Sequence, residues 1–174
     1  MILGGLQKLT LIDYPGHIAA TVFTVGCNFR CPFCHNPELI SNFKFQISNV
    51  LENDFFSFLE TRRGKLEGIC ITGGEPTIQP DIQEFVRKIK DLGYKVKLDT
   101  NGTRPDVLRQ LFSEKLLDFV AMDIKNSPDK YNATANSKID LERIKLSIDL
   151  IRNSGVDYEF RTTAVPGLHK EEDF

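Results

Sequence analysis

The chain has 174 residues, of which 41% are hydrophobic and 26% are charged, and its formal net charge is −2. These values suit one globular domain with a sizeable core, and they give no general electrostatic reason to expect nucleic acid or an anionic membrane as a partner. No apolar segment reaches the ~18 residues that a membrane-spanning helix needs, and the N-terminus lacks a secretory pattern. We therefore expect a cytoplasmic protein.

Extended and helical patterns alternate along the chain. Residues 2–26 indicate two extended segments around a turn at 13–16, and the second segment leads into a loop rich in cysteine. Parallel strands need crossover helices, so the alternation that follows predicts an α/β fold with a parallel sheet. From apolar spacing, Pro and Gly, we expect helices at 48–62, 80–92, 104–115 and 141–151 and strands at 68–72, 94–100, 118–124 and 157–165.

Three of the four cysteines, Cys27, Cys31 and Cys34, lie within eight residues in the segment CNFRCPFCHN. Two disulfides are conceivable in a secreted chain, but this clustering favours a reduced compartment and metal binding. Helix-like winding of the loop would turn all three sulfurs to one side. The same spacing fits a buried stripe of small residues, an interpretation that the polar residues between the cysteines disfavour.

The number of cysteines separates two kinds of metal site. Structural zinc usually takes four ligands, and the fourth would have to be His35, which is adjacent to Cys34, or the distant Cys70. Soft thiolates also suit an iron–sulfur cubane, in which three protein ligands leave one iron open for catalysis. The cluster is therefore favoured over zinc. Cys70 lies in an apolar strand, and we expect it to be a core residue.

Polar motifs stand at the carboxyl ends of three expected strands. They are ITGGEP at 71–76, LDTNG at 98–102 and MDIK at 122–125. In a barrel-like series of strands and helices these ends share the face on which binding sites form, and paired glycines permit close approach of a ligand to the backbone. Each motif also fits an ordinary turn or a strand end that meets solvent.

Together these motifs resemble a known family. C-x₃-C-x₂-C, with Phe33 before the last cysteine, resembles the signature of the radical S-adenosylmethionine (SAM) enzymes, and its order with GGEP, LDTNG and MDIK resembles the glycyl-radical-enzyme activases. Residues 5–27, GLQKLTLIDYPGHIAATVFTVGC, are similar to the start of the activating proteins of anaerobic ribonucleoside-triphosphate reductase.

The resemblance implies one radical SAM domain over residues 1–174, folded as a partial (β/α) barrel. An N-terminal hairpin at 1–25 would lead into a cluster loop at 26–36. The barrel would be cut short before its sixth strand, so we expect a chain that is either naturally shortened or incomplete at its C-terminus.

The resemblance also implies an activity. A [4Fe–4S] cluster would be held by Cys27, Cys31 and Cys34. Reductive cleavage of SAM would give methionine and a 5′-deoxyadenosyl radical. This radical would then take a Cα hydrogen from a glycine of anaerobic ribonucleotide reductase. Because no second cysteine cluster is present, the electron would come from a flavodoxin- or ferredoxin-like partner. A monovalent cation is a further candidate near the SAM carboxylate. The SAM site implied by the resemblance comprises Phe33, Gly73, Gly74, Glu75, Asp99, Thr100, Asn101, Asp123, Lys125 and Arg161.

Two other classes of function stay open. A radical SAM enzyme acting on a small molecule, such as a purine-like heterocycle, would share these motifs, whereas a non-enzymatic zinc-binding module would share only the cysteines. Stimulation of SAM cleavage by a glycine-loop peptide would separate the first class from an activase. Zinc at one equivalent, without iron or sulfide, would identify the second.

Overall fold

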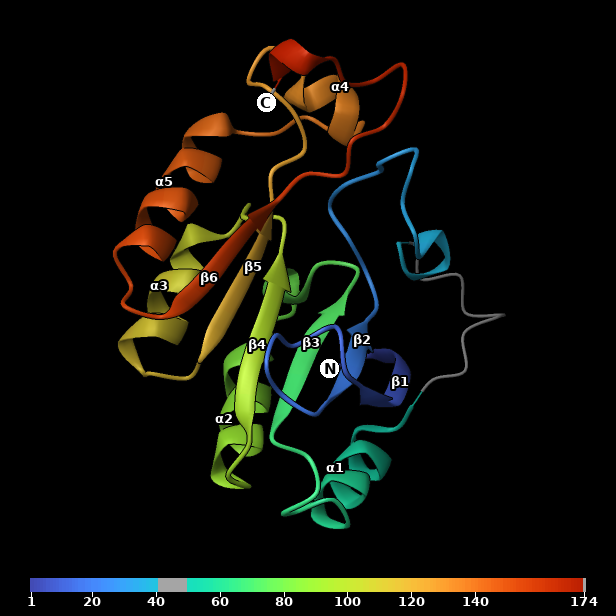
Figure 1. Ribbon diagram of the computed structural model, residues 1–174, viewed down its shortest axis with the longest axis vertical. Coiled ribbons are helices and arrows are strands. Elements are labelled where there is room, and N and C mark those ends of the chain that lie inside the picture. The colour runs from blue at the N-terminus through green and yellow to red at the C-terminus, as the bar shows by residue number, and fades with distance from the viewer. Residues whose placement is uncertain (41–49, 174) are drawn as a thin grey trace.

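The computed structural model describes residues 1–40 and 50–173, and its centre is a curved sheet of six strands in the order β1-β2-β3-β4-β5-β6 (Figure 1). β1 and β2 form an antiparallel hairpin, and every later neighbour is parallel. The parallel part of the described sheet comprises the five strands β2 to β6, and the sheet does not close, so the expected partial barrel without a sixth parallel strand is confirmed. The strands are β1 (Leu3–Thr10), β2 (Ala19–Thr24), β3 (Gly68–Gly73), β4 (Lys95–Thr100), β5 (Phe119–Asp123) and β6 (Asp157–Arg161).

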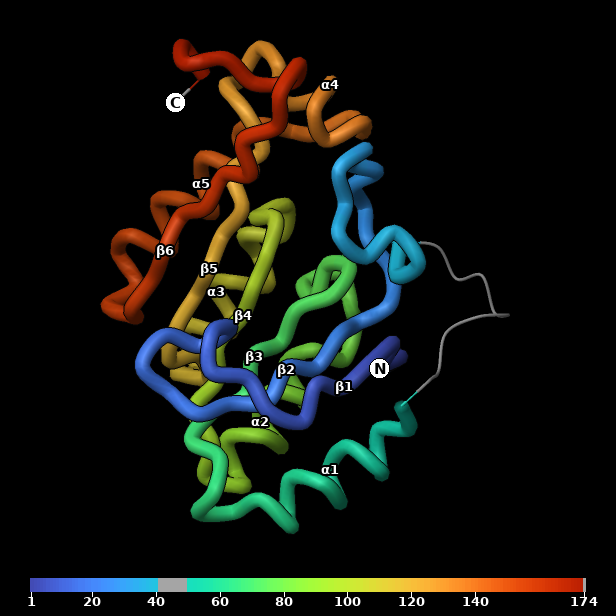
Figure 2. Tube along the Cα trace, turned by 45° about the vertical axis from the view of Figure 1, so that its right-hand side comes forward, coloured from blue at the N-terminus to red at the C-terminus, as the bar shows by residue number. Residues whose placement is uncertain are grey.

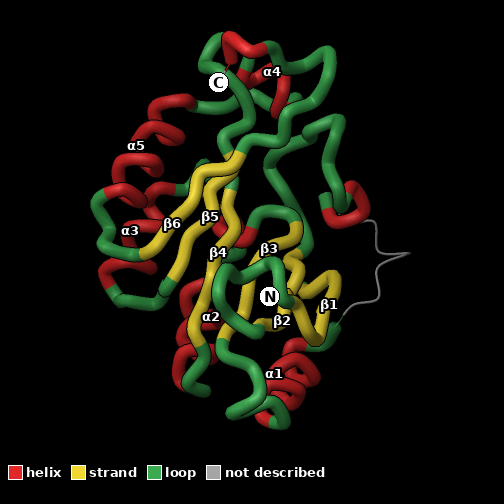
Figure 3. Tube along the Cα trace, viewed as in Figure 1, coloured by secondary structure: helices red, strands yellow, loops and turns green. Residues whose placement is uncertain are grey.

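Helices connect the parallel strands, and α2, α3 and α5 lie along one face of the sheet (Figure 3). The core forms between these helices and alternate strand residues such as Ile71, Leu98 and Val120. None of the helices in the described ranges is both long and apolar enough to cross a membrane. The helices are α1 (Glu52–Glu60), α2 (Ile82–Asp91), α3 (Pro105–Ser113), α4 (Tyr131–Ala135) and α5 (Leu141–Arg152), and Pro37–Leu39, Pro76–Ile78 and Glu171–Asp173 are short 3₁₀ turns.

Three local predictions differ from the structure. The helix expected at 48–62 begins only at Glu52. The backbone N–H of Val50 instead donates to the carbonyl oxygen of Leu3 (3.2 Å), so that Val50 extends the hairpin. Residues 48 and 49 lie outside the described residues. The last strand ends at Arg161 rather than at residue 165. The five-residue helix α4 was not expected, since it is too short to show a helical period.

The turn between β1 and β2 covers the amino ends of the central strands. Tyr14 in this turn is only 2% exposed, and its ring contacts Phe119 edge-on, with 6.0 Å between centroids. It also fills the space beside Gly68, where an added Cβ would lie 2.7 Å from the ring. Figure 2 shows the turn crossing in front of the sheet. A segment that reads as a simple hairpin connection therefore plugs one end of the partial barrel.

Replacing this plug is expected to destabilise the fold. Tyr14→Ala should lower the free energy of unfolding by about 3–5 kcal/mol, because a large aromatic ring is lost from a buried position. Tyr14→Phe keeps the ring and is the matched control, which should cost clearly less. Urea denaturation of the metal-free proteins measures both. Equal losses for the two variants would show that the hydroxyl, and not the packed ring, is what the turn contributes.

Candidate functional site

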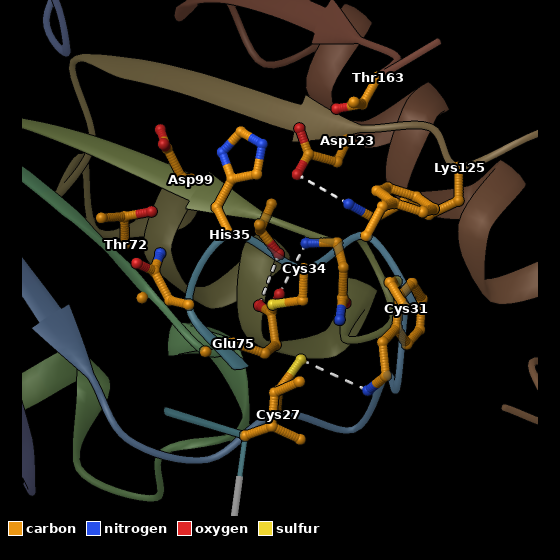
Figure 4. Close-up of a pocket in the computed structure, with 18 of the residues that line it drawn as sticks. Cys27, Cys31, Cys34, His35, Thr72, Glu75, Asp99, Asp123, Lys125 and Thr163 are labelled. Carbon is orange, nitrogen blue, oxygen red and sulfur yellow. Dashed lines mark hydrogen bonds and ion pairs between the residues drawn. The ribbon is translucent and has the colours of Figure 1, made fainter. Parts of the chain in front are cut away.

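One cavity lies at the carboxyl ends of the parallel strands, opposite the turn that carries Tyr14 (Figure 4). It is bounded by the loop after β2 and by the ends of β3 to β6, as expected for strands whose carboxyl ends share one edge. All thirteen residues to which the sequence points line this cavity. They are Cys27, Cys31, Phe33, Cys34, Gly73, Gly74, Glu75, Asp99, Thr100, Asn101, Asp123, Lys125 and Arg161.

The loop at 26–36, which carries the three cysteines and is called the cysteine loop below, reaches the cavity without forming a helix. Its backbone is fixed at its start and near its middle, because Gly26 N donates to Leu39 O (2.7 Å) and Arg30 N donates to Ala135 O (2.9 Å). The Arg30 guanidinium donates to the Cys27 carbonyl (2.6 Å). Hydrogen bonds, and not the helical spacing considered from sequence, thus turn the three thiols toward one space. All three are unpaired by disulfides and partly exposed.

A side-chain amide joins this loop to the end of β4. Asn28 donates to the Thr103 hydroxyl (2.8 Å), and Asn101 donates to the Asn28 carbonyl oxygen (2.8 Å). The Asn101 oxygen in turn accepts from Thr103 N–H (3.1 Å). Asn101 thus serves to align the cysteine loop with the neighbouring strand, in addition to lining the cavity.

Burial raises the pKa of two of the cysteine thiols, those of Cys27 and Cys31. Burial raises the pKa of Cys27 to about 11, although Phe29 N–H lies 3.4 Å from the sulfur and acts in the opposite direction. Burial also raises the pKa of Cys31, against the effect of Lys125. Because metals bind thiolates, loading these residues must release protons.

The glycines of GGEP have a packing role that the sequence did not reveal. They were expected to let a ligand approach the backbone, and the structure shows that they also let the backbone around Thr24 and Gly26 approach. Gly74 N donates to Thr24 O (2.9 Å), and a Cβ on Gly74 would overlap the carbonyl of Gly26. Gly73 has φ +113°, a conformation that side chains disfavour. Both glycines line the cavity, yet strand-to-loop packing is what requires them.

Glu75 lines the cavity but is almost fully buried. Its side chain is 1% exposed, and it accepts hydrogen bonds from the Thr100 hydroxyl (2.7 Å), Asn101 N–H (2.6 Å) and both donors of Thr77. Burial raises its pKa, while these donors oppose the shift. Glu75 N–H also donates to Gly26 O (2.8 Å). The residue thus connects the ends of three strands.

An ion-pair network forms the opposite wall. The Arg161 guanidinium lies 3.2 Å from Asp99 and 3.0 Å from Asp123, and Lys125 Nζ lies 3.0 Å from the other Asp123 oxygen. Burial alone would raise the pKa of Asp123, but Lys125 and Arg161 together hold it below its ordinary value. Arg161 also lies 3.6 Å from Glu159. Each of the three guanidinium nitrogens of Arg161 therefore pairs with a carboxylate, whereas Lys125 has one carboxylate partner among the described ion pairs.

The sequence interpretation missed Lys97, which is 1% exposed and forms an ion pair with Asp99. Cys70 is buried, as expected, but its Sγ lies 3.8 Å from Asp99 Oδ1 and 4.0 Å from Lys97 Nζ. It therefore faces charged groups and not the apolar core. Alternation along β3 and β4 could have revealed this, since residues 70, 72, 97 and 99 share one face. Further cavity residues that were not predicted are Phe29, His35, Asn36, Ile40, Thr72 and Thr163.

The chain is similar to known proteins over most of its length. The sequence profile of the Radical SAM superfamily matches residues 21–173. A protein of Methanocaldococcus jannaschii, named as an inferred glycyl-radical enzyme activating enzyme, is 38% identical over 179 residues, covering 99% of this chain and 72% of that protein. A 7-carboxy-7-deazaguanine synthase of Thermoplasma acidophilum is 33% identical over 113 residues, covering 64% of this chain and 49% of the synthase.

Solved structures share the fold. The crystal structure of Streptococcus suis SuiB bound to S-adenosylmethionine superposes with a TM-score of 0.60 at 18% identity, covering 86% of this chain and 33% of that protein. At this identity the likeness concerns the arrangement of strands and helices alone.

Gly74→Ala should destabilise the metal-free protein by about 1–3 kcal/mol, because the new methyl group displaces the backbone that precedes Cys27. Gly5→Ala is the matched control, since its Cβ would lie 3.5 Å from the nearest atom of Phe23, an ordinary contact. Urea denaturation compares the two. A Gly74 variant as stable as the Gly5 variant would contradict the packing role assigned to GGEP.

Alkylation should reveal the raised pKa of Cys27. With a pKa of about 11, its thiolate fraction at pH 8 is about 100-fold below that of an ordinary cysteine, and the alkylation rate should rise about tenfold per pH unit until that pKa is reached. Mass spectrometry of the metal-free protein after pulses of iodoacetamide measures this rate. A plateau already at pH 8 to 9 would contradict the raised pKa.

Proposed function

The chain belongs to the radical SAM superfamily, and on that basis we propose that it activates a glycyl radical enzyme. Enzymes of this superfamily use a [4Fe–4S] cluster and SAM, which together supply the one-electron cleavage of SAM to methionine and a 5′-deoxyadenosyl radical. The observation that carries the proposal is the 38% identity, over 99% of the chain, to a relative named for glycyl-radical enzyme activation.

The residues around the cavity fit these two cofactors. Cys27, Cys31 and Cys34 present three free thiols to one space. In the described part of the chain no three Cys, His, Asp or Glu side chains lie close enough to share a single ion. A cubane does not need such proximity, because each thiolate binds a different iron.

Lys125 is the best candidate to bind the SAM carboxylate. Both it and Arg161 line the cavity, but Arg161 already contacts three carboxylates. Lys125 has three N–H donors and pairs with Asp123 at 3.0 Å, so donors remain for a ligand. Arg161 would then hold Asp99 and Asp123 in place. A monovalent cation beside Asp99, Thr100 and Asp123 stays within the proposal.

The target that we propose is anaerobic ribonucleotide reductase. The support is the similarity of residues 5–27 to the start of its activating proteins. Glycine suits an enclosed radical because it has no side chain to obstruct approach. An external flavodoxin- or ferredoxin-like donor would supply the electron. The second candidate is a reaction on a small purine-like heterocycle, which the similarity to 7-carboxy-7-deazaguanine synthase favours.

Electron paramagnetic resonance tests the function directly. The anaerobically reconstituted and reduced protein is incubated with SAM and with purified anaerobic ribonucleotide reductase or pyruvate formate-lyase. We expect a glycyl radical doublet on the reductase, formation of 5′-deoxyadenosine, and loss of both with Cys31→Ala. A glycine-loop peptide should stimulate SAM cleavage more than purine-like heterocycles do. Stimulation by heterocycles alone would reject the activase, and zinc without iron would reject radical chemistry altogether.

Lys125→Met should raise the dissociation constant for SAM about 10- to 100-fold, because it removes a charge-assisted hydrogen bond. Lys130→Met is the matched control, since Lys130 is a nearby cation that pairs with Asp173 (2.8 Å) outside the cavity. Anaerobic titration calorimetry of the cluster-loaded proteins measures both affinities. Equal affinity in the two variants would remove Lys125 from the SAM site.

A further inference from the structure

A buried hydroxyl next to the cysteine loop lacks a hydrogen-bond acceptor among the described residues. Tyr131, the first residue of α4, is 2% exposed, and its hydroxyl donates to no atom of residues 1–40 or 50–173. The backbone N–H of Lys125 lies near the hydroxyl oxygen and can only donate to it. A buried hydroxyl usually has a partner, and leaving one unsatisfied costs free energy. The hydroxyl therefore needs an acceptor that the described part of the chain does not provide.

Helix α4 supports the cysteine loop. Tyr131 and Ala135 are four residues apart, so they share a face of the helix. On that face the Ala135 carbonyl accepts from Arg30 N–H (2.9 Å) and lies 4.0 Å from Cys31 Sγ. The Tyr131 ring meets Phe29 edge-on, with 6.4 Å between centroids. Figures 1 and 2 both place α4 beside the loop.

Two of the ionisable groups near the Tyr131 hydroxyl already accept hydrogen bonds. The groups that influence the Tyr131 hydroxyl electrostatically are Asp123, Cys31 and Glu75. The two oxygens of Asp123 accept from Arg161 and Lys125, and the two oxygens of Glu75 accept from Thr100 and from Asn101 N–H. The adjacent Lys125 backbone amide can only donate. Of these neighbours, the sulfur of Cys31 is the one whose accepting capacity is unused by such donors.

We propose that the Tyr131 hydroxyl donates a hydrogen bond to the sulfur side of the [4Fe–4S] cluster at Cys31 and thereby sets its reduction potential. A thiol is a weak acceptor, whereas a thiolate bound to iron is charged and accepts strongly. Hydrogen bonds to cluster sulfurs stabilise the electron-rich reduced state and raise the potential. Tyr131 is thus a positioning and tuning residue. The inference rests on the cluster of the proposed function and is independent of the target enzyme.

Two tyrosine-to-phenylalanine variants test this inference. Tyr131→Phe removes the hydroxyl that lacks an acceptor among the described residues. Tyr94→Phe removes a buried hydroxyl that donates to Leu59 O (2.7 Å), far along the chain from the cysteine loop. We expect Tyr131→Phe to leave the melting temperature of the metal-free protein unchanged or raised, and to shift the midpoint potential of the loaded protein to a more negative value. Tyr94→Phe should lower the melting temperature and leave the potential unchanged.

Two results would overturn the inference. One is an equal midpoint potential in Tyr131→Phe and wild type, and the other is a loss of metal-free stability in Tyr131→Phe as large as in Tyr94→Phe, which would place the acceptor within the polypeptide. Electron nuclear double resonance adds an independent readout, because an exchangeable proton coupled to the reduced cluster should disappear only in Tyr131→Phe. Failure to form a glycyl radical would reject the proposed target while leaving these measurements interpretable.

Discussion

The buried carboxylate of Glu75 is the interaction on which the site depends. Its side chain binds the end of β4 through Thr100 and Asn101, and its own N–H binds Gly26 ahead of the cysteine loop. The ends of β2, β3 and β4 therefore meet at one residue. Several donors compensate for the burial of a carboxylate that water no longer solvates. Loss of this side chain would leave those donors without their acceptor and remove the side-chain link between β3 and β4, whereas the backbone bond to Gly26 would remain.

The second constraint is close backbone approach. Because GGEP has no Cβ at residues 73 and 74, β3 can run directly against Thr24 and Gly26. This brings the cysteine loop over the strand ends, where Asn28 reaches Asn101. The position of the three thiols is thus set by glycine packing and amide hydrogen bonds before any cofactor binds. Preorganisation of this kind lowers the ordering cost of binding.

Much of the fold and of the cavity could be predicted from sequence, for a physical reason. Periodicity places strands and helices, and parallel topology then forces GGEP, LDTNG and MDIK to one edge, so residues far apart in sequence meet without further information. Periodicity cannot show which charged side chains form ion pairs with one another. Arg161 was expected to face the cavity and does line it, but its three carboxylate partners become visible only once β4, β5 and β6 are adjacent. The short helix α4 and the unpartnered Tyr131 hydroxyl also depend on tertiary packing.

The charged residues at and behind one wall of the cavity compensate one another. Three cations, Lys97, Lys125 and Arg161, face three carboxylates, Asp99, Asp123 and Glu159. This ion-pair network is therefore close to neutral. An oxidised [4Fe–4S] core with three thiolates carries one net negative charge, and SAM carries one net positive charge, so the two cofactors balance each other. A network whose charges compensate one another leaves that mutual attraction little changed, and in a partly buried cavity the attraction is screened less than in water. In the function that we propose, individual donors such as that of Lys125 would then orient SAM, and the cluster would supply the opposite charge.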